Sequence, residues 1–212
     1  KARLLAGMKA ADIDALLMFR QESMYWLTGY DTFGYVYFQS LVLTADGRVV
    51  LMTRAPDLRQ AQNTSNIADI RIWVDRDGAS PADDLRVILD ELGLGGGRLG
   101  VEYEAYGLTG RNAMRLNAAL DGFATLIDES ELVSRLRLIK SSAEIAYTRR
   151  AAELARLGAL AEHIVLEAAP AGAADDAEGQ AEEEVGVRED DRDQLRRASE
   201  HPPPSFSDRE AA

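Results

Sequence analysis

The chain lacks cysteine altogether and has only two histidines among its 212 residues. Without cysteine it can build neither a disulfide framework nor a thiolate metal site, and a reducing cytoplasm is the expected setting. His163 has Glu167 four residues on, at the spacing of one helix face, but an ordinary helix surface is the favoured interpretation. His201 lies in a proline-rich stretch. HExxH, DxDxDG, phosphate-loop and G-x-S-x-G motifs are also missing, so no complete active site or metal site is expected.

Long apolar runs and an excess of basic residues are equally absent. No run approaches the ~20 apolar residues of a membrane span, and no leader of basic, apolar and small residues opens the chain. We therefore expect neither a membrane partner nor a signal peptide. The net charge of −12 argues against nucleic acid as a partner. Most of that charge belongs to residues 171–212, which hold 13 acidic residues against 5 arginines.

Alternating apolar segments and turn signals predict an α/β domain with a mixed five- to six-stranded sheet flanked by helices. Ser80 is expected to cap the helix over 80–93, with Pro81 at its first position. Thr109 is expected to cap the helix over 109–120. The expected strands are 15–19, 36–44, 49–52, 70–74, 99–103 and 124–127, and the expected helices of this domain are 57–62, 80–93 and 109–120.

A capping box at Ser141–Glu144 opens a long helix from Ile145 to about Glu167. Beyond Pro170 the apolar pattern stops, and composition favours disorder. We therefore divide the chain into an α/β domain over 1–135, a linker helix over 136–169 and an acidic tail over 170–212.

Two weak motifs have ordinary explanations. The glycines of Gly95–Gly100 match G-x-G-x-x-G, but a helix precedes them and a strand follows, the reverse of a dinucleotide loop. Glu102 and Glu104 end a strand on one face and could form an acid–base pair, with His163 as a third member. Solvated carboxylates at a strand exit are the favoured interpretation.

An aromatic cluster between Tyr25 and Phe38 is the more informative feature. Around Gly29 and Gly34 the chain is expected to form a loop. For Tyr30, Phe33 and Tyr35, core packing and a wall against a ligand or second subunit are equally favoured, because aromatics supply large rigid contact area.

Three segments together resemble the amino-terminal domain of the creatinase/prolidase family over about residues 1–165. They are Met24–Tyr30, which is similar to a Y-L-T-G-(F/Y) segment, Gly100–Glu102, which is similar to G-V-E, and Leu136–Ile145, which is similar to L-R-x-I-K-S-x-x-E-I. Ala143 departs from the proline that many members have there. The segment Arg20–Tyr35 is most similar to ectoine hydrolases.

The resemblance implies a domain that forms a homodimer and closes over the partner's active site. Residues expected to contact substrate on this ground are Tyr30, Phe33, Tyr35 and Tyr37. Family members carry their chemistry in a carboxyl-terminal domain, often with two divalent metal ions held by two Asp, a His and two Glu. No position here inherits those ligands, so we expect no cofactor in this chain.

The resulting hypothesis is a truncated or split hydrolase, inactive alone, whose parent activity is ectoine hydrolysis or Xaa-Pro dipeptide hydrolysis. The alternative is a stand-alone small-ligand-binding or regulatory module that pairs with a full-length relative.

Overall fold

A computed structural model describes residues 1–168, with side chains described as far as residue 160. The expected acidic tail over 170–212 and the side chains of His163 and His201 lie outside this part of the chain. The chain divides into two compact units, Lys1–Ile139 and a second that begins at Lys140. The first unit contains the sheet and all the helices that pack on it.

Six strands form one mixed sheet in the order β4-β3-β2-β1-β5-β6. Strand β2 is antiparallel to both of its neighbours, and every other neighbouring pair is parallel. The expected mixed sheet of five to six strands is thereby confirmed, with six strands. The strands are β1 (Ala15–Met18), β2 (Ser40–Thr44), β3 (Val49–Arg54), β4 (Asp69–Trp73), β5 (Arg98–Val101) and β6 (Thr125–Asp128).

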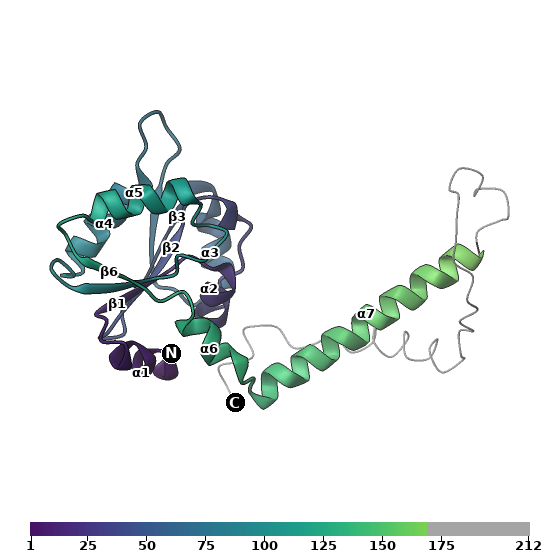
Figure 1. The fold of residues 1–212 in the computed structure, drawn as a ribbon. Helices are drawn as coiled ribbons and strands as arrows, with labels where there is room; N and C mark the ends of the chain where they lie inside the picture. The colour runs from purple at the N-terminus through teal and green to yellow at the C-terminus, as the bar shows by residue number, and fades with distance from the viewer. Residues whose placement is uncertain (169–212) are drawn as a thin grey trace. The chain divides into compact units, whose positions relative to one another are not determined.

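Helices cover both faces of this sheet, so the first unit has three layers (Figure 1). Helices α4 (Pro81–Glu91) and α5 (Gly110–Leu120) pack on one face. The opposite face is covered by α1 (Ala2–Ala10), α2 (Gln21–Thr28), α3 (Leu58–Thr64) and α6 (Leu132–Leu138). Two short 3-10 turns, η1 (Gly34–Val36) and η2 (Ala55–Asp57), complete the unit.

Strand β1 explains why a continuous apolar run is needed at the centre of the sheet. Ala15 and Leu17 pack in the cluster under α4 and α5, whereas Leu16 and Met18 pack in the cluster on the other face. All four side chains are fully buried. A strand buried on both faces has no polar side in its pattern, and β1 accordingly reads as an unbroken apolar segment.

The second strand is shorter than the sequence predicts. The predicted strand began at residue 36, but β2 begins at Ser40, opposite Met52 of β3. The Thr32 hydroxyl accepts the Gly34 N–H at 2.8 Å, which starts the tight turn η1 in place of extended chain. Residues 34–36 are therefore unavailable for sheet pairing.

The predicted caps are confirmed at two of three helices. Thr109 accepts the Asn112 N–H at 3.4 Å, whereas Ser80 occupies the cap position of α4 without a side-chain capping bond. In the second unit, Glu144 accepts the Ser141 N–H at 2.7 Å and the Ser141 hydroxyl accepts the Glu144 N–H at 3.2 Å. This capping box begins α7 (Ser142–Ala168).

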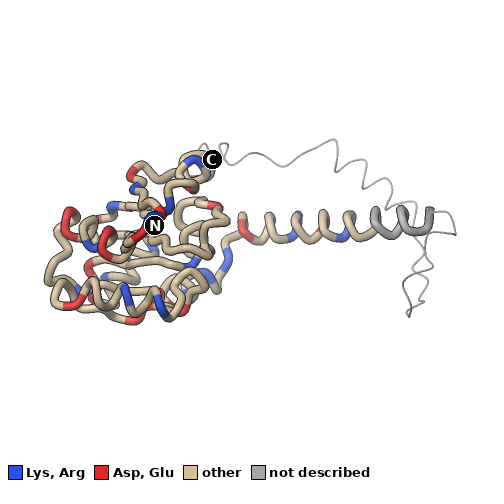
Figure 2. Tube along the Cα trace, turned by 90° about the horizontal axis from the view of Figure 1, so that it is seen from above, with Lys and Arg blue, Asp and Glu red and all other residues tan. Residues whose placement is uncertain are grey.

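Charged residues of both signs are interspersed over the described chain (Figure 2). This distribution agrees with the near balance of acidic and basic residues before residue 171. Within residues 1–168 no helix combines the length and apolar character that crossing a lipid bilayer requires.

Candidate functional site

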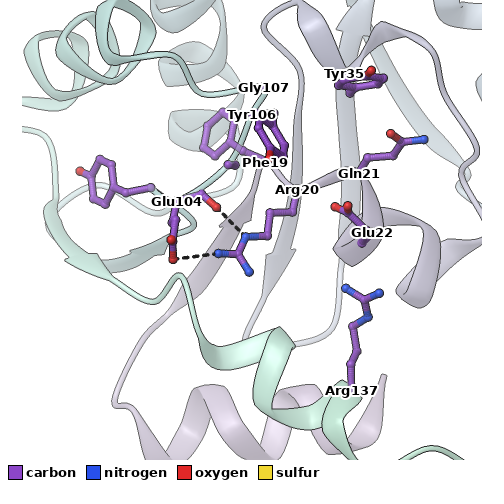
Figure 3. Close-up of a pocket in the computed structure, with 11 residues that line it drawn as sticks. Phe19, Arg20, Gln21, Glu22, Tyr35, Glu104, Tyr106, Gly107 and Arg137 are labelled. Carbon is purple, nitrogen blue, oxygen red and sulfur yellow. Dashed lines mark hydrogen bonds and ion pairs between the residues drawn. The ribbon is translucent and has the colours of Figure 1, made fainter.

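A pocket of about 930 Å³ lies where β1 and β5 end. Its walls come from the residues after β1, the first turn of α2, the loop after β5, the loop around η1, and α6 (Figure 3). The lining residues are Phe19, Arg20, Gln21, Glu22, Tyr35, Tyr103, Glu104, Ala105, Tyr106, Gly107 and Arg137.

The topology of the sheet accounts for the position of this pocket. Strands β1 and β5 are parallel neighbours, but the chain continues from β1 toward β2 on one side and from β5 toward β6 on the other. Connections that diverge at the carboxyl ends of two parallel strands leave a crevice between them, and such crevices are the usual ligand sites of open α/β sheets.

Arg20 lines the pocket, and its guanidinium makes three hydrogen bonds there. Its guanidinium donates to the Glu104 carbonyl at 2.6 Å, to the Ser134 hydroxyl at 2.6 Å and to the Glu104 carboxylate at 3.2 Å. A second carboxylate, Glu131, lies 3.6 Å away. Arg20 thus ties the end of β1 to the loop after β5 and to α6.

Glu102, which directly follows β5, binds the residues after β1 and the start of α2 from inside the protein. Its carboxylate accepts the N–H groups of Phe19 and Arg20, both at 3.0 Å, and the Ser23 hydroxyl at 2.6 Å. The side chain is completely buried, and this burial raises the pKa of the Glu102 carboxyl above its usual value. The start of α2 is therefore fixed to the end of β5.

The favoured interpretation of Glu102 as a solvated carboxylate is wrong. Glu102 points into the junction between β1 and α2, where backbone donors compensate its burial. Glu104 is exposed and paired with Arg20. The two carboxylates therefore share no solvent-facing acid–base site, and only Glu104 lines the pocket.

The four aromatic residues expected to contact substrate occupy different surroundings. Tyr30 is fully buried, and its hydroxyl bonds to Thr32, Gln39 and Thr53 at 3.1–3.3 Å. Of the two interpretations offered for Tyr30, core packing describes its position. Its burial raises the pKa of the Tyr30 phenol.

The other three aromatics reach the surface. Phe33 is 85% exposed, and Tyr35 lines the pocket. The Arg54 guanidinium lies 3.7 Å from the centre of the Tyr37 ring, a cation–π contact. The structure thus brings only Tyr35 of the four to the pocket.

Sequence reasoning missed most of the pocket, above all Arg20, Glu22, Tyr106 and Arg137. The available signal was positional, because residues directly after two parallel strands meet at one edge of a sheet. The sequence predicted both strands but not their adjacency. No group of three or more His, Asp or Glu side chains within the described part of the chain could hold a metal ion.

Comparison with known proteins shows which family this fold belongs to. The model of the creatinase/prolidase N-terminal domain matches residues 1–139. An uncharacterized hydrolase/peptidase of Sinorhizobium fredii is 32% identical over 156 residues, which are 70% of this chain and 40% of that protein. The ectoine hydrolase of Halomonas elongata is 29% identical over 161 residues, covering 69% and 38% of the two chains. The chain therefore spans about two fifths of the length of these relatives.

Solved structures give the same result. The N-terminal domain of the cytoplasmic peptidase PepQ from Mycobacterium tuberculosis superposes with a TM-score of 0.52 at 26% identity, covering 64% of this chain and 95% of that one. An Xaa-Pro dipeptidase from Bacillus anthracis gives 0.61 at 25% identity, covering 77% and 41%. The family match, the six-stranded sheet and these neighbours agree, and the chain belongs to the creatinase/prolidase family through its amino-terminal domain.

Proposed function

We propose that residues 1–139 serve as the non-catalytic, pocket-covering domain of a hydrolase that cleaves an amide-type C–N bond in a small substrate. The observation that carries the proposal is the family match over these residues, together with relatives that are named as hydrolases and extend well beyond the matched part. The hydrolytic groups, including any divalent metal ions, are then supplied outside the described part of this chain.

Two substrates follow from the relatives. The ectoine hydrolase of Halomonas elongata supports ectoine, and the Xaa-Pro dipeptidase of Bacillus anthracis supports a dipeptide that ends in proline. The cytoplasmic peptidase among the similar structures supports a cytoplasmic location for this chain as well.

The exposed aromatic surface around η1 supports the covering role. Phe33, Val36 and Tyr37 are 85%, 58% and 47% exposed, and Tyr106 on the pocket rim is 90% exposed. Apolar side chains gathered this way on a surface usually meet a partner. We propose that, in a homodimer of the complete hydrolase, this surface faces the active site of the second subunit.

The first test is turnover by the purified 212-residue chain with ectoine and with alanyl-proline, with and without Mn²⁺. We expect no hydrolysis under either condition. Hydrolysis that follows the chain through every purification step would contradict the non-catalytic role.

The second test exchanges domains. Residues 1–139 replace the matching domain of the Halomonas ectoine hydrolase in one chimera and of the Bacillus dipeptidase in another. We expect the chimera with the correct parent chemistry to turn over its substrate, and Phe33→Ala or Tyr35→Ala to lower its kcat/KM at least tenfold. Tyr25→Ala is the matched control, because Tyr25 is also an exposed aromatic but belongs to α2. Equal losses in all three variants would count against the covering role.

A second candidate function is a stand-alone binding or regulatory module that pairs with a full-length relative. The pocket favours it, because all of its lining residues belong to the first unit. This reading predicts that adding the chain changes the activity of a co-expressed full-length relative, whereas the covering role predicts activity only in covalently joined chimeras.

A further inference from the structure

We propose that the pocket beyond β1 and β5 is itself a binding site for a small zwitterion, with Arg137 receiving the carboxylate and Glu22 the protonated nitrogen. The inference concerns binding by this chain alone, and only the choice of probes rests on the proposed function.

The argument begins with the charges in the pocket. Two acidic and two basic side chains line it. Arg20 is engaged by Glu104 at 3.2 Å and by Glu131, which does not line the pocket, at 3.6 Å. Glu22 and Arg137 remain, and neither forms a hydrogen bond or ion pair, with the other or with any side chain among the described residues. The pocket therefore presents one available charge of each sign.

Glu22 and Arg137 belong to helices that are held in place by hydrogen bonds to other parts of the domain. Glu22 lies in the first turn of α2, whose start is fixed by the bonds from Phe19, Arg20 and Ser23 to Glu102. Arg137 lies near the end of α6. Supports that are fixed before a ligand arrives lower the entropy cost of binding.

Helix α6 is held from two sides. The Ser134 hydroxyl accepts from Arg20 at 2.6 Å, and the Leu136 carbonyl accepts from Arg3 at 2.8 Å. Figure 3 shows the Arg137 guanidinium extending from α6 toward the start of α2, where Glu22 lies. The two opposite charges therefore face the same space.

The remaining walls suit an organic ligand. Tyr35, Tyr103 and Tyr106 contribute aromatic surface, which favours apolar carbon and a cationic nitrogen alike. The volume of about 930 Å³ is within the range of roughly 300–1,000 Å³ that small-molecule sites occupy. A ligand of dipeptide size fits this space with room for water.

The charge balance selects the ligand class. A simple anion would gain from Arg137 but meet repulsion from Glu22, and a simple cation would meet the reverse. A zwitterion satisfies both, with a carboxylate that an arginine can bind through two parallel hydrogen bonds. Binding should therefore depend on both charges of the ligand.

The test is calorimetric titration of the 212-residue chain with ectoine and with alanyl-proline. N-acetyl-alanyl-proline keeps only the negative charge, and alanyl-prolinamide keeps only the positive one. We expect each zwitterion to bind at least tenfold more tightly than either singly charged analogue.

Variants locate the site. Arg137→Gln should abolish the preference for alanyl-proline over its amide, and Glu22→Gln should abolish the preference over the N-acetyl form. Arg135→Gln is the matched control, because Arg135 is exposed on the same helix and does not line the pocket. The exchange of both charges, Glu22→Arg with Arg137→Glu, should restore a preference for zwitterions, which guards against loss by misfolding.

Two outcomes overturn the inference: no binding of either zwitterion, or binding that Arg137→Gln and Glu22→Gln leave unchanged. The result is separable from the proposed function. Active chimeras without binding by the chain would remove only this inference, and binding with inactive chimeras would remove only the hydrolase role.

Discussion

Among single residues, Glu102 couples the stability of the domain to pH. Its pKa is raised in the folded state because burial penalises the charged form. The folded state therefore binds the proton more tightly than the unfolded state does. Its contribution to stability is fully present below the ordinary glutamate pKa and is lost as pH rises through the raised value.

Glu102→Gln should remove this pH dependence. The glutamine oxygen can still accept the Phe19 and Arg20 N–H groups, and its amide can donate to the Ser23 hydroxyl, as the protonated acid would. Urea unfolding at a series of pH values from 4 upward measures the difference between the two proteins. We expect the stability of the variant relative to the native chain to increase with pH, and a constant difference would contradict the coupling.

Glu102→Ala should behave quite differently, because it leaves the buried Phe19 N–H, the partly buried Arg20 N–H and the buried Ser23 hydroxyl without an acceptor. We expect a loss of about 2–4 kcal/mol in the free energy of unfolding, from the usual penalty for unsatisfied buried groups. Glu104→Ala removes an exposed carboxylate and leaves Arg20 its contact with Glu131, so it serves as control, with an expected loss of roughly 0–1 kcal/mol. Similar losses in both variants would mean that the Glu102 bonds add little.

Tyr30→Phe tests the core interpretation of that residue. The change removes a buried hydroxyl that contacts Thr32, Gln39 and Thr53 and should cost about 1–2 kcal/mol by thermal or urea unfolding. Tyr37→Phe, at a half-exposed ring, should change stability by less than about 0.5 kcal/mol. A neutral Tyr30→Phe would argue that the buried network is not a stabilising feature.

The sequence could not separate these residues because loops have no periodicity that marks inside and outside. Tyr30 and Phe33 stand three positions apart in one aromatic cluster, yet one is fully buried and the other is 85% exposed. Glu102 was misjudged for a related reason. A carboxylate just after a strand is usually solvated, and its burial depends on donors that come from residues 19–23.

Among the elements, the loop after β5 depends on the absence of a side chain at Gly107. A Cβ there would lie 2.8 Å from the Tyr35 carbonyl oxygen and 3.2 Å from that of Phe19. Gly107→Ala must therefore push the loop after β5 away from the backbone at Phe19 and Tyr35, which also line the pocket. We expect weaker zwitterion binding, by at least tenfold in calorimetry, with the far-ultraviolet circular dichroism retained.

The control for Gly107 is Gly110→Ala at the start of α5, where a Cβ would meet nothing within 4 Å. That variant should bind as the native chain does. If Gly107→Ala also binds normally, the close approach of these segments is not what shapes the pocket.

Elements with strong local signals were predicted and those fixed by tertiary contacts were not. The apolar run of β1 and the capping box at Ser141 carry their information within a few residues. Helix α6 was not predicted as a separate helix: the predicted linker helix over 136–169 is divided between α6, which ends at Leu138, and α7, which begins at Ser142. Helix α6 is short and is anchored by Arg3 and Arg20 from distant parts of the chain. Short helices gain most of their stability from such packing.

For the whole molecule, both apolar clusters end before the second unit begins. Every buried or partly buried member of the two clusters lies between Leu4 and Leu136. We therefore expect a fragment of residues 1–139 to unfold in one cooperative transition, with a midpoint close to that of the full chain. Circular dichroism melting of both proteins measures this, and a fragment without a cooperative transition would show that later residues are needed for folding.

The mixed sheet was foreseeable because strand and turn signals recur between residues 15 and 127, and the family was foreseeable because three short segments match its pattern. The strand order was not, since periodicity identifies strands but says nothing about which strands are neighbours. The pocket lies beyond two strands that this order makes neighbours. The fold could therefore be predicted from the sequence more completely than the site.

The placement of β1 also bears on how the domain folds during synthesis. Residues 15–18 pair with residues 41–44 on one side, but their partners on the other side are residues 99–101. On a ribosome, strands β1 to β4 emerge and pair while one edge of β1 still lacks its neighbour. An open, apolar strand edge is a template for pairing with other chains. The interval before β5 emerges is thus the period in which this domain is most exposed to aggregation, and slowing translation there should lower its soluble yield.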